Sequence, residues 1–310
     1  MRKEYKQTAA VWLGVLTVFV AALAVQTVAV AILRVAAPDA MENASVRILL
    51  STLPMYAVGI PLATLVFRFA DPMPPTEKRS LSPATFAGVV AICFALALVG
   101  SLFGQAVNNG ISAVTGREAE NPVEEITRNV PFWLNLLVVG VCAPVAEEFV
   151  YRKCVIDRTR RYGDGAAVLI SALLFGAIHG NFTQFFYAVF LGAVFGAVYC
   201  ATGKLRYTIA LHMLFNCVGT VSSEMLGRLG GEWSLKILAQ HPETVVWLSV
   251  LGLIYLASVT CAPVAAHFLV PKLRPARETV SLPAGDAAKV ALLNPALWAL
   301  VAMIVYLFVF

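Results

Sequence analysis

The sequence predicts an all-α protein, a polytopic transmembrane helical bundle with eight to nine spans. Hydrophobic residues make up 59% of the 310 positions and charged residues only 13%, and the mean hydropathy is +0.79. Soluble domains have roughly 25% charged residues and 45–50% apolar ones. The apolar runs recur along the whole length, and no polar stretch is long enough for a soluble domain. We therefore expect a single integral-membrane domain over residues 1–310.

A helix needs about 20 apolar residues to cross the hydrocarbon core. The apolar stretch after the basic N-terminus is longer than the roughly 7–15 residues of a signal-peptide core, so we expect a retained first helix. The fifth candidate is short and lies between the turn signals Gly163-Asp164-Gly165 and Gly180-Asn181. Asn294-Pro295 interrupts the ninth near its start, which leaves open eight spans plus a re-entrant or peripheral segment. The predicted spans are Thr8–Leu33, Ile48–Phe67, Pro83–Gln105, Val130–Val150, Gly165–His179, Thr183–Thr202, Tyr207–Leu226, Thr244–Val270 and Val290–Phe310.

The basic residues of the connecting segments indicate the orientation, because cytoplasmic loops are enriched in Lys and Arg. With alternating spans, 17 of the 23 Lys and Arg residues fall on the side of the N-terminus. We therefore expect a cytoplasmic N-terminus. The lack of a soluble domain and of a retention signal favours a prokaryotic plasma membrane. The net charge of +5 does not indicate a nucleic-acid partner, since the basic residues are scattered over short loops.

Ionisable residues inside the predicted spans concentrate in residues 130–226, which we expect to form a four-span catalytic core. A charge in hydrocarbon costs at least about 2.5 kcal/mol, so such residues are candidates for a functional site. Glu148 and Arg152 are four residues apart and can pair on one helix face. Glu147 then points about 100° round the helix. Pro144, three residues upstream, is expected to disturb the helix at this point.

Two histidines lie in the same region. His179 shares a face of the fifth span with Phe175, and His212 shares a face of the seventh with Asn216. If these helices pack together, the two imidazoles and the Asn216 carboxamide converge with Glu147 on a polar cavity inside the bilayer.

Depth poses a difficulty for this convergence. Counted from the preceding loop, His179 lies about 22 Å into its span at 1.5 Å per residue. Glu147 and His212 would be shallower. Either the fourth helix continues beyond Arg152 to Arg161, or the fifth begins outside the hydrocarbon.

One carboxylate, two imidazoles and one carboxamide suit the hydrolysis of a peptide bond. The carboxylate takes a proton from water as a general base. The imidazoles orient the water, shuttle a proton or hold a metal. The carboxamide or an imidazole donates a hydrogen bond to the oxyanion. Two histidines and a carboxylate are also a recognised zinc ligand set, although the H-E-x-x-H spacing is missing.

The chain contains E-E-x-x-x-R at Glu147–Arg152, F-x-x-x-H at Phe175–His179 and H-x-x-x-N at His212–Asn216. In order, separation and position within the spans, these resemble the three motifs of the CAAX prenyl protease type II (CPBP, or ABI) family of intramembrane endopeptidases. The resemblance covers about residues 130–226.

This resemblance implies a role for each motif residue. Glu147 is the water-activating base, His179 and His212 are its catalytic partners, and Asn216 is the oxyanion donor. It also implies that Glu148 and Arg152 are supporting residues. The family is described both as metalloproteases and as metal-independent glutamic proteases. The resemblance therefore leaves open whether a divalent metal such as Zn²⁺ binds His179 and His212.

The implied activity is an endopeptidase that cleaves a membrane-anchored protein or peptide, with prenylated CAAX-type substrates included. A proton-coupled transporter that uses Glu147, His179 and His212 as a proton relay is an alternative. It predicts inverted repeats, which we do not find in the sequence. A catalytically silent membrane scaffold is a second alternative, against which the intact motifs argue. Gly100-x-x-x-Gly104 and Gly192-x-x-x-Gly196 indicate close helix packing inside the bundle.

Overall fold

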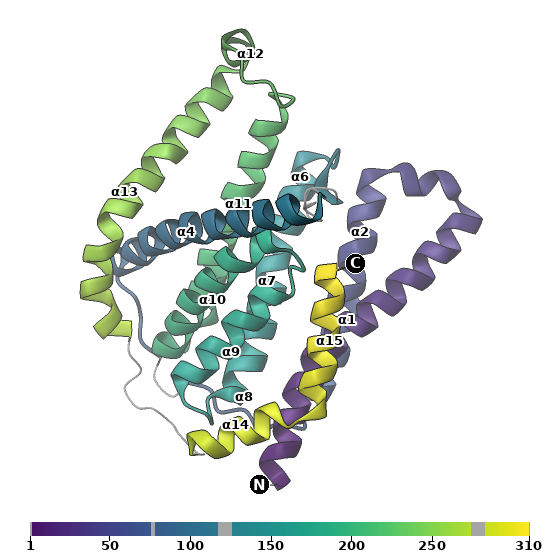
Figure 1. Ribbon diagram of the computed structural model, residues 1–310, viewed down its shortest axis with the longest axis vertical. Coiled ribbons are helices and arrows are strands. Elements are labelled where there is room, and N and C mark those ends of the chain that lie inside the picture. Colours follow the sequence, from purple (N-terminus) through teal and green to yellow (C-terminus); the bar gives the residue numbers. More distant parts are fainter. Residues whose placement is uncertain (1, 76–77, 117–125, 274–282, 310) are drawn as a thin grey trace.

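The computed structural model describes residues 2–75, 78–116, 126–273 and 283–309 (Figure 1). All regular elements in these ranges are helical, in agreement with the predicted class. The element η1 is a 3-10 helix, and η2, η3 and η4 are π-helical. In chain order the elements are α1 (Arg2–Ala36), η1 (Pro38–Glu42), α2 (Ala44–Pro54), η2 (Met55–Gly59), α3 (Ile60–Phe67), α4 (Pro83–Thr115), α6 (Phe132–Asn135), η3 (Leu136–Cys142), α7 (Ala143–Glu148), η4 (Phe149–Ile156), α8 (Asp157–Thr159), α9 (Asp164–Ala177), α10 (Phe182–Thr202), α11 (Leu205–Gly227), α12 (Leu235–Gln240), α13 (Pro242–Leu273), α14 (Ala284–Leu292) and α15 (Pro295–Val309).

Seven helices within the described ranges are long and apolar enough to cross a membrane. Two of them, Ala44–Phe67 and Phe132–Thr159, each contain several consecutive elements. An eighth is reached only if the bent pair α14 and α15, at 61° to each other, counts as one span. The bend falls at Asn294-Pro295, because Pro295 has no N–H to continue the α14 ladder. The predicted ninth span is thus a broken helix, and its last residue, Phe310, lies outside the described residues.

The helix at the predicted fifth span is too short to cross the hydrocarbon core. Helix α9 has 14 residues, or about 21 Å at 1.5 Å per residue, against a hydrocarbon core of about 30 Å. Gly180, with φ 63°, turns the chain after it, a backbone conformation that favours glycine. The described residues therefore support seven spans, or eight if α14 and α15 form one, and not nine. The helix from Phe132 runs beyond Arg152 to Thr159, which is the continuation that the first of the two explanations for the depth of His179 requires.

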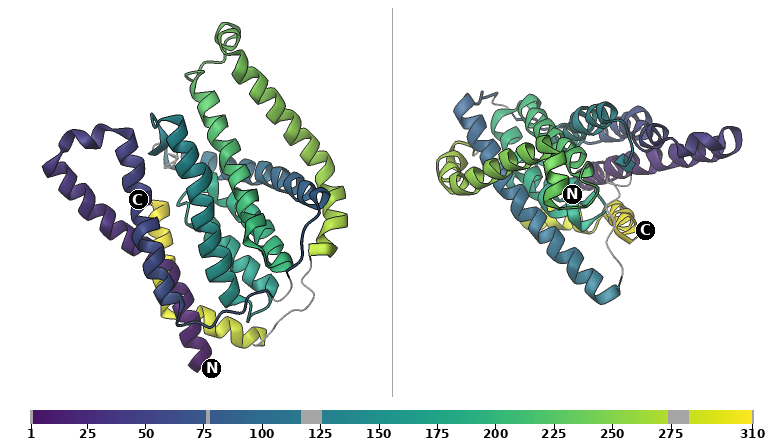
Figure 2. Two further views of the ribbon diagram at one scale, coloured as in Figure 1. Left: turned by 180° about the vertical axis from the view of Figure 1, so that it is seen from behind. Right: turned by 90° about the horizontal axis from the view of Figure 1, so that it is seen from above.

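Helix α10 packs against both α4 and α9, and α4 crosses the other helices at a steep angle (Figures 1 and 2). Glycines permit the close approach. A Cβ at Gly100 would collide with the backbone of Tyr187, and one at Gly104 with the Phe182 carbonyl. On the other face of α10, a Cβ at Gly192 would lie 3.2 Å from the Ala172 Cα of α9. Both predicted small-residue motifs thus contribute to helix packing.

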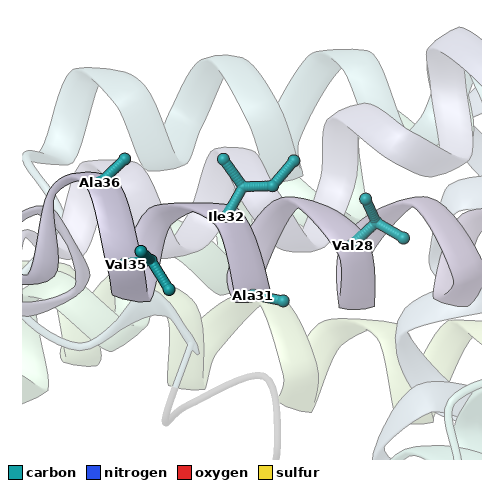
Figure 3. A pocket seen from close by; sticks show the side chains of 5 residues that line it. All are labelled: Val28, Ala31, Ile32, Val35 and Ala36. Atoms are coloured by element: carbon teal, nitrogen blue, oxygen red, sulfur yellow. The ribbon is translucent and has the colours of Figure 1, made fainter.

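Two hairpins extend from this packed core, namely the outer half of α1 with α2, and α11–α12–α13 (Figure 2). On the outer half of α1, Val28, Ile32 and Val35 are 58%, 60% and 87% exposed. With Ala31 and Ala36 they line an apolar depression of about 460 Å³ (Figure 3). All of these side chains are alkyl groups, so this depression suits contact with lipid chains and carries no catalytic group.

Polar contacts join α1, the segment after α3 and the end of α8 near the N-terminus. Arg161 donates to Glu4 at 2.8 Å and to the Asp71 carbonyl at 2.6 Å. Hydrogen bonds from Lys3 and Gln7 lower the pKa of the Asp71 carboxyl below its usual range. These contacts hold the end of the Phe132–Thr159 helix against α1. They therefore help to set the position of Glu147 and Glu148 along the helix axis relative to α1.

Candidate active site

The two adjacent glutamates lie on α7, a short α-helical stretch between the π-helical segments η3 and η4. The Ala143 N–H donates to the Val138 carbonyl, five residues back, whereas an α-helix would use Val139. Pro144 has no N–H. The Val139 carbonyl therefore lacks its usual helical donor. Instead it accepts from Asn216 Nδ2 at 2.9 Å. The wide turn thus ties η3 to α11 beside the glutamates.

Glu148 and Arg152 form a fully buried ion pair, in agreement with their predicted spacing. Both side chains are 0% exposed. Arg152 Nε lies 2.9 Å from Glu148 Oε2, and Nη2 lies 3.3 Å from Oε1. The third guanidinium nitrogen donates to Ser171 Oγ at 2.6 Å, and Ser171 Oγ donates to the Tyr151 carbonyl at 2.9 Å. A buried charge needs such partners, and here α9 supplies one of them.

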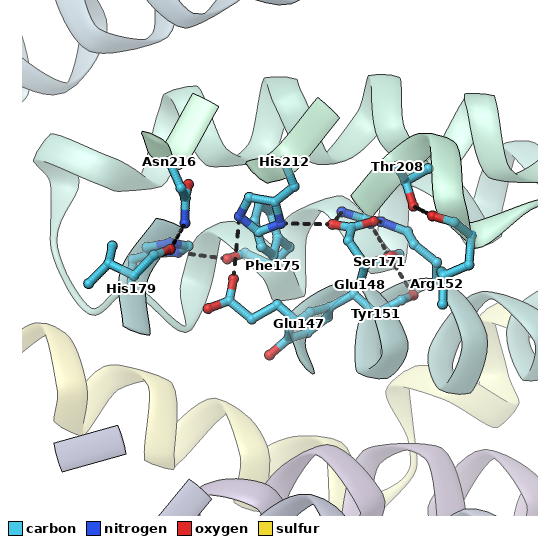
Figure 4. Close-up of polar contacts among 12 residues, drawn as sticks. Glu147, Glu148, Tyr151, Arg152, Ser171, Phe175, His179, Thr208, His212 and Asn216 are labelled. Carbon is cyan, nitrogen blue, oxygen red and sulfur yellow. Dashed lines mark hydrogen bonds and ion pairs between the residues drawn. The ribbon is translucent and has the colours of Figure 1, made fainter. Parts of the chain in front are cut away.

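His212 lies between the two glutamates (Figure 4). Its Nδ1 is 3.1 Å from Glu148 Oε1, and its Nε2 is 3.8 Å from Glu147 Oε2. Glu148 is held as a carboxylate by Arg152 and can only accept, so Nδ1 carries the proton. In the neutral ring Nε2 is then a bare acceptor that faces Glu147. The supporting glutamate thus fixes the tautomer of the histidine and the direction of its lone pair.

Glu147 presents one carboxylate oxygen that no group in the described part of the chain satisfies. Its side chain is 16% exposed, but Oε2 is buried and has no hydrogen-bond partner among the described residues. The 3.8 Å to His212 Nε2 is too long for a hydrogen bond. A water molecule between them could donate one proton to each acceptor, and a bridging water is the usual solution for a polar contact of this length.

His179 comes just after α9, and its side chain lies near Glu147 and His212 (Figure 4). Its Nδ1 lies 2.9 Å from the Phe175 carbonyl, which can only accept, so Nδ1 carries the proton and Nε2 is bare. Asn181 Nδ2 holds the His179 carbonyl at 2.7 Å. The Phe175 ring packs edge-on against both imidazoles, with 5.3 Å between ring centres in each case. Phe175 therefore spaces the two histidines.

Asn216 lies one turn after His212 on α11, on the side of His179 (Figure 4). Its Nδ2 uses one N–H for the Val139 carbonyl. A carboxamide nitrogen has two N–H donors, so one remains for a ligand. Neither His179 nor His212, when neutral, carries a proton on Nε2. Of these three side chains, Asn216 is therefore the one that can donate a hydrogen bond to a ligand.

The structure therefore joins Glu148, Arg152 and His212 by hydrogen bonds. It places Glu147 3.8 Å from His212, with His179 and Asn216 beside them (Figure 4). Sequence reasoning missed Ser171, which bridges Arg152 to the backbone, and the role of the Val139 carbonyl. Ser171 precedes Phe175 by four residues, so the helical spacing of the second motif could have identified it.

The residues present do not fit a three-ligand zinc site, the arrangement typical of catalytic zinc. His179 and His212 both have a bare Nε2, as metal ligands do. However, within the described ranges there is no group of three His, Cys, Asp or Glu side chains that could hold a metal ion.

Comparisons with known proteins agree with the motif resemblance. Residues 129–218 match the family model described as "Type II CAAX prenyl endopeptidase Rce1-like". The "Putative membrane peptidase YdiL" of Bacillus subtilis (strain 168) is 26% identical over 125 residues, which cover 37% of this chain and 49% of that protein. The chain thus matches about half the length of this relative. No solved structure matches.

Proposed function

Since residues 129–218 match the model of the Rce1-like type II CAAX prenyl endopeptidases, we propose that this chain is an intramembrane endopeptidase. It hydrolyses a peptide bond in a membrane-anchored protein or peptide by means of a water molecule activated by Glu147. The observation that carries this proposal is the unsatisfied Glu147 Oε2 facing the bare Nε2 of His212 at 3.8 Å. Two acceptors in this arrangement provide a site for one donor molecule, and water is the donor that hydrolysis requires.

In the proposed reaction, Glu147 takes one proton from the bound water as general base. The water oxygen forms a bond to the carbonyl carbon of the substrate, and the carbonyl oxygen becomes an oxyanion. The second N–H of Asn216 donates to that oxyanion. Glu147 then returns its proton to the amide nitrogen as the C–N bond breaks. The products are a carboxylic acid and an amine, and the acid then loses its proton to the solvent. His212 keeps the water oriented because Glu148 fixes its ring.

His179 has a supporting role in this scheme. Its bare Nε2 accepts a hydrogen bond or a proton, and the Phe175 carbonyl prevents the ring from turning over. The scheme contains no metal-dependent step, because the described side chains do not form a three-ligand group.

The substrate class follows from the place of the site. Glu147, His212 and Asn216 lie on helices long and apolar enough to cross a membrane, so the proposed substrate itself enters the bilayer, as an anchored or prenylated peptide would. We further propose the orientation predicted from the basic residues, with the N-terminus in the cytoplasm of a prokaryotic cell. A transporter is less well supported, because the polar groups form one closed cluster.

The test is a cleavage assay with purified protein in detergent. A farnesylated CAAX peptide and a panel of membrane-anchored peptides are incubated with wild type and with Glu147→Gln, and mass spectrometry maps each cut. We expect Glu147→Gln to lower the rate by about 10²–10⁴-fold, the usual contribution of a general base. Glu224→Gln is the matched control, since Glu224 lies on α11 with a side chain that is 36% exposed.

Cleavage by wild type and by Glu224→Gln, with loss in Glu147→Gln, would support the mechanism. Full activity of Glu147→Gln would refute the assignment of the base. Substrate-dependent proton flux in liposomes, without cleavage of any peptide, would favour the transporter instead.

A further inference from the structure

A second cavity lies at the end of the molecule where the N-terminus is bound. It has a volume of about 280 Å³ and opens between the end of α3, the segment at Pro72 and Pro74, and the η4–α8 stretch. Its lining includes the cations Arg68, Lys153 and Arg158. The candidate active site uses none of these three residues.

The charge of this cavity is positive, because among the described residues of its lining one carboxylate, Asp157, faces the three cations. Asp157 is already engaged, with Lys153 Nζ at 2.8 Å and the Tyr199 hydroxyl at 2.9 Å. The Lys153 side chain is 48% exposed, and its ammonium group has two further N–H donors. The described lining residues therefore have a net charge of about +2 and donors to offer an anion.

Arg158 provides the fixed part of the lining. Its Nε donates to the Phe67 and Ala70 carbonyls at 2.8 and 3.1 Å, and Nη1 donates to the Cys154 carbonyl at 3.1 Å. These bonds hold the guanidinium over the Phe67 ring, 5.3 Å from its centre. The donors on Nη2 are not used by any of these contacts. A guanidinium held rigidly with free N–H groups is well suited to phosphate.

The surroundings of the cavity indicate that a phosphate would come from the membrane. The cavity begins where the apolar span Ala44–Phe67 ends. Leu62, Leu65 and Phe69 are 43%, 50% and 77% exposed on this helix end, which is the surface that lipid chains would cover. A basic group directly beyond the apolar part of a span lies at the level of the lipid headgroups.

We propose that this cavity binds the phosphate of an anionic phospholipid in the leaflet on the N-terminal side. Arg68, Lys153 and Arg158 donate to the phosphate oxygens, while the acyl chains lie along the exposed apolar side chains of α3. The same phosphate joins α3 to η4, the segment that carries Arg152. Binding therefore stabilises the contact between the second and fourth spans. This proposal does not depend on the proposed peptidase function, because binding is measured directly.

The experiment measures lipid binding to the full chain in detergent by native mass spectrometry and by thermal shift. The probes are phosphatidylglycerol, phosphatidylcholine, diacylglycerol and glycerol 3-phosphate. The variants are Arg68→Gln and Arg68→Gln/Lys153→Gln. Lys6→Gln/Arg206→Gln is the matched control, since it removes two basic charges outside the cavity lining. The double variant removes the Lys153–Asp157 ion pair, whereas Arg68→Gln leaves it intact. If the double variant does not fold, Arg68→Gln still tests the proposal.

We expect phosphatidylglycerol to bind and stabilise the wild type, and its affinity to fall about fivefold for each cavity charge removed. The control variant should keep the wild-type affinity. Equal affinity in wild type and in Arg68→Gln would overturn the proposal. Equal stabilisation by glycerol 3-phosphate and phosphatidylglycerol would replace the lipid with a free phosphate ester.

A third result would also overturn it. If both variants bind lipid normally but lose affinity for a peptide with a free C-terminal carboxylate, and not for the amidated peptide, the cavity recognises the end of a peptide. The lipid assignment would then be wrong.

Discussion

Replacing Arg152 by methionine removes one member of a fully buried ion pair and leaves the other in place. Glu148 would keep only the hydrogen bond from His212 Nδ1, and Ser171 Oγ would lose the guanidinium. Breaking a buried pair in this way costs about 3–5 kcal/mol. We expect the free energy of unfolding to fall by about that amount. Glu148→Gln/Arg152→Met should recover more than half of the loss, because no uncompensated buried charge remains.

The matched control is the pair formed by Glu224, in the last turn of α11, and Arg228, which follows that helix. It has the same i,i+4 spacing and an N–O distance of 3.4 Å, but its side chains are 36% and 42% exposed. Exposed pairs contribute about 0–1 kcal/mol, so Arg228→Met should have a small effect. Unfolding in mixed dodecyl maltoside and dodecyl sulfate micelles, followed by tryptophan fluorescence, measures all four proteins. Equal losses for Arg152→Met and Arg228→Met would refute the reasoning, as would a double variant no more stable than Arg152→Met.

Three further predictions concern packing, the oxyanion donor and metal. Gly100→Ala should lower the free energy of unfolding by about 1–3 kcal/mol, because the added methyl group collides with α10. Gly110→Ala on the same helix has open space around it and should be neutral or slightly stabilising. Equal denaturation midpoints of the two variants would contradict this. Asn216→Ala should lower kcat about 10²–10³-fold with little change in KM, and Ser222→Ala on the same helix should keep kcat, which initial-rate measurements can check. Removal of divalent metals with a chelator should leave the cleavage rate within about twofold of that of the untreated protein. If the protein contained about one metal ion per chain and lost its activity when this ion was removed, the prediction would be wrong.

The apolar spans and the Glu148–Arg152 pair could be predicted because both depend on local spacing. Sequence spacing also predicted that His212 and Asn216 share a face. It could not predict which glutamate each nitrogen of His212 would meet, because that depends on how α11 packs against α7. The Ser171 contact depends in the same way on how α9 approaches η4.

The count of spans shows the same limit. The turn signals around the predicted fifth span were correct, but they enclose a helix of only 14 residues. Composition indicates an apolar helix there and does not decide whether it crosses the bilayer. Asn294-Pro295 correctly marked the weak point of the last predicted span, whereas the angle of 61° between its two parts depends on packing against α1.

The π-helical segments on either side of α7 make the site tolerant of changes in chain length. Each wide turn holds one residue more than an α-helical turn, so η3 could lose a residue and tighten into a regular helix. The helix after it would keep its rotation, and Glu147 would still face His212. If the lost residue lies after Val139, the tightened turn would bring the Val139 carbonyl opposite Pro144, which has no N–H, so this carbonyl would still accept its hydrogen bond from Asn216. A single deletion after Val139 in η3 would thus spare both the base and the contact that holds the oxyanion donor.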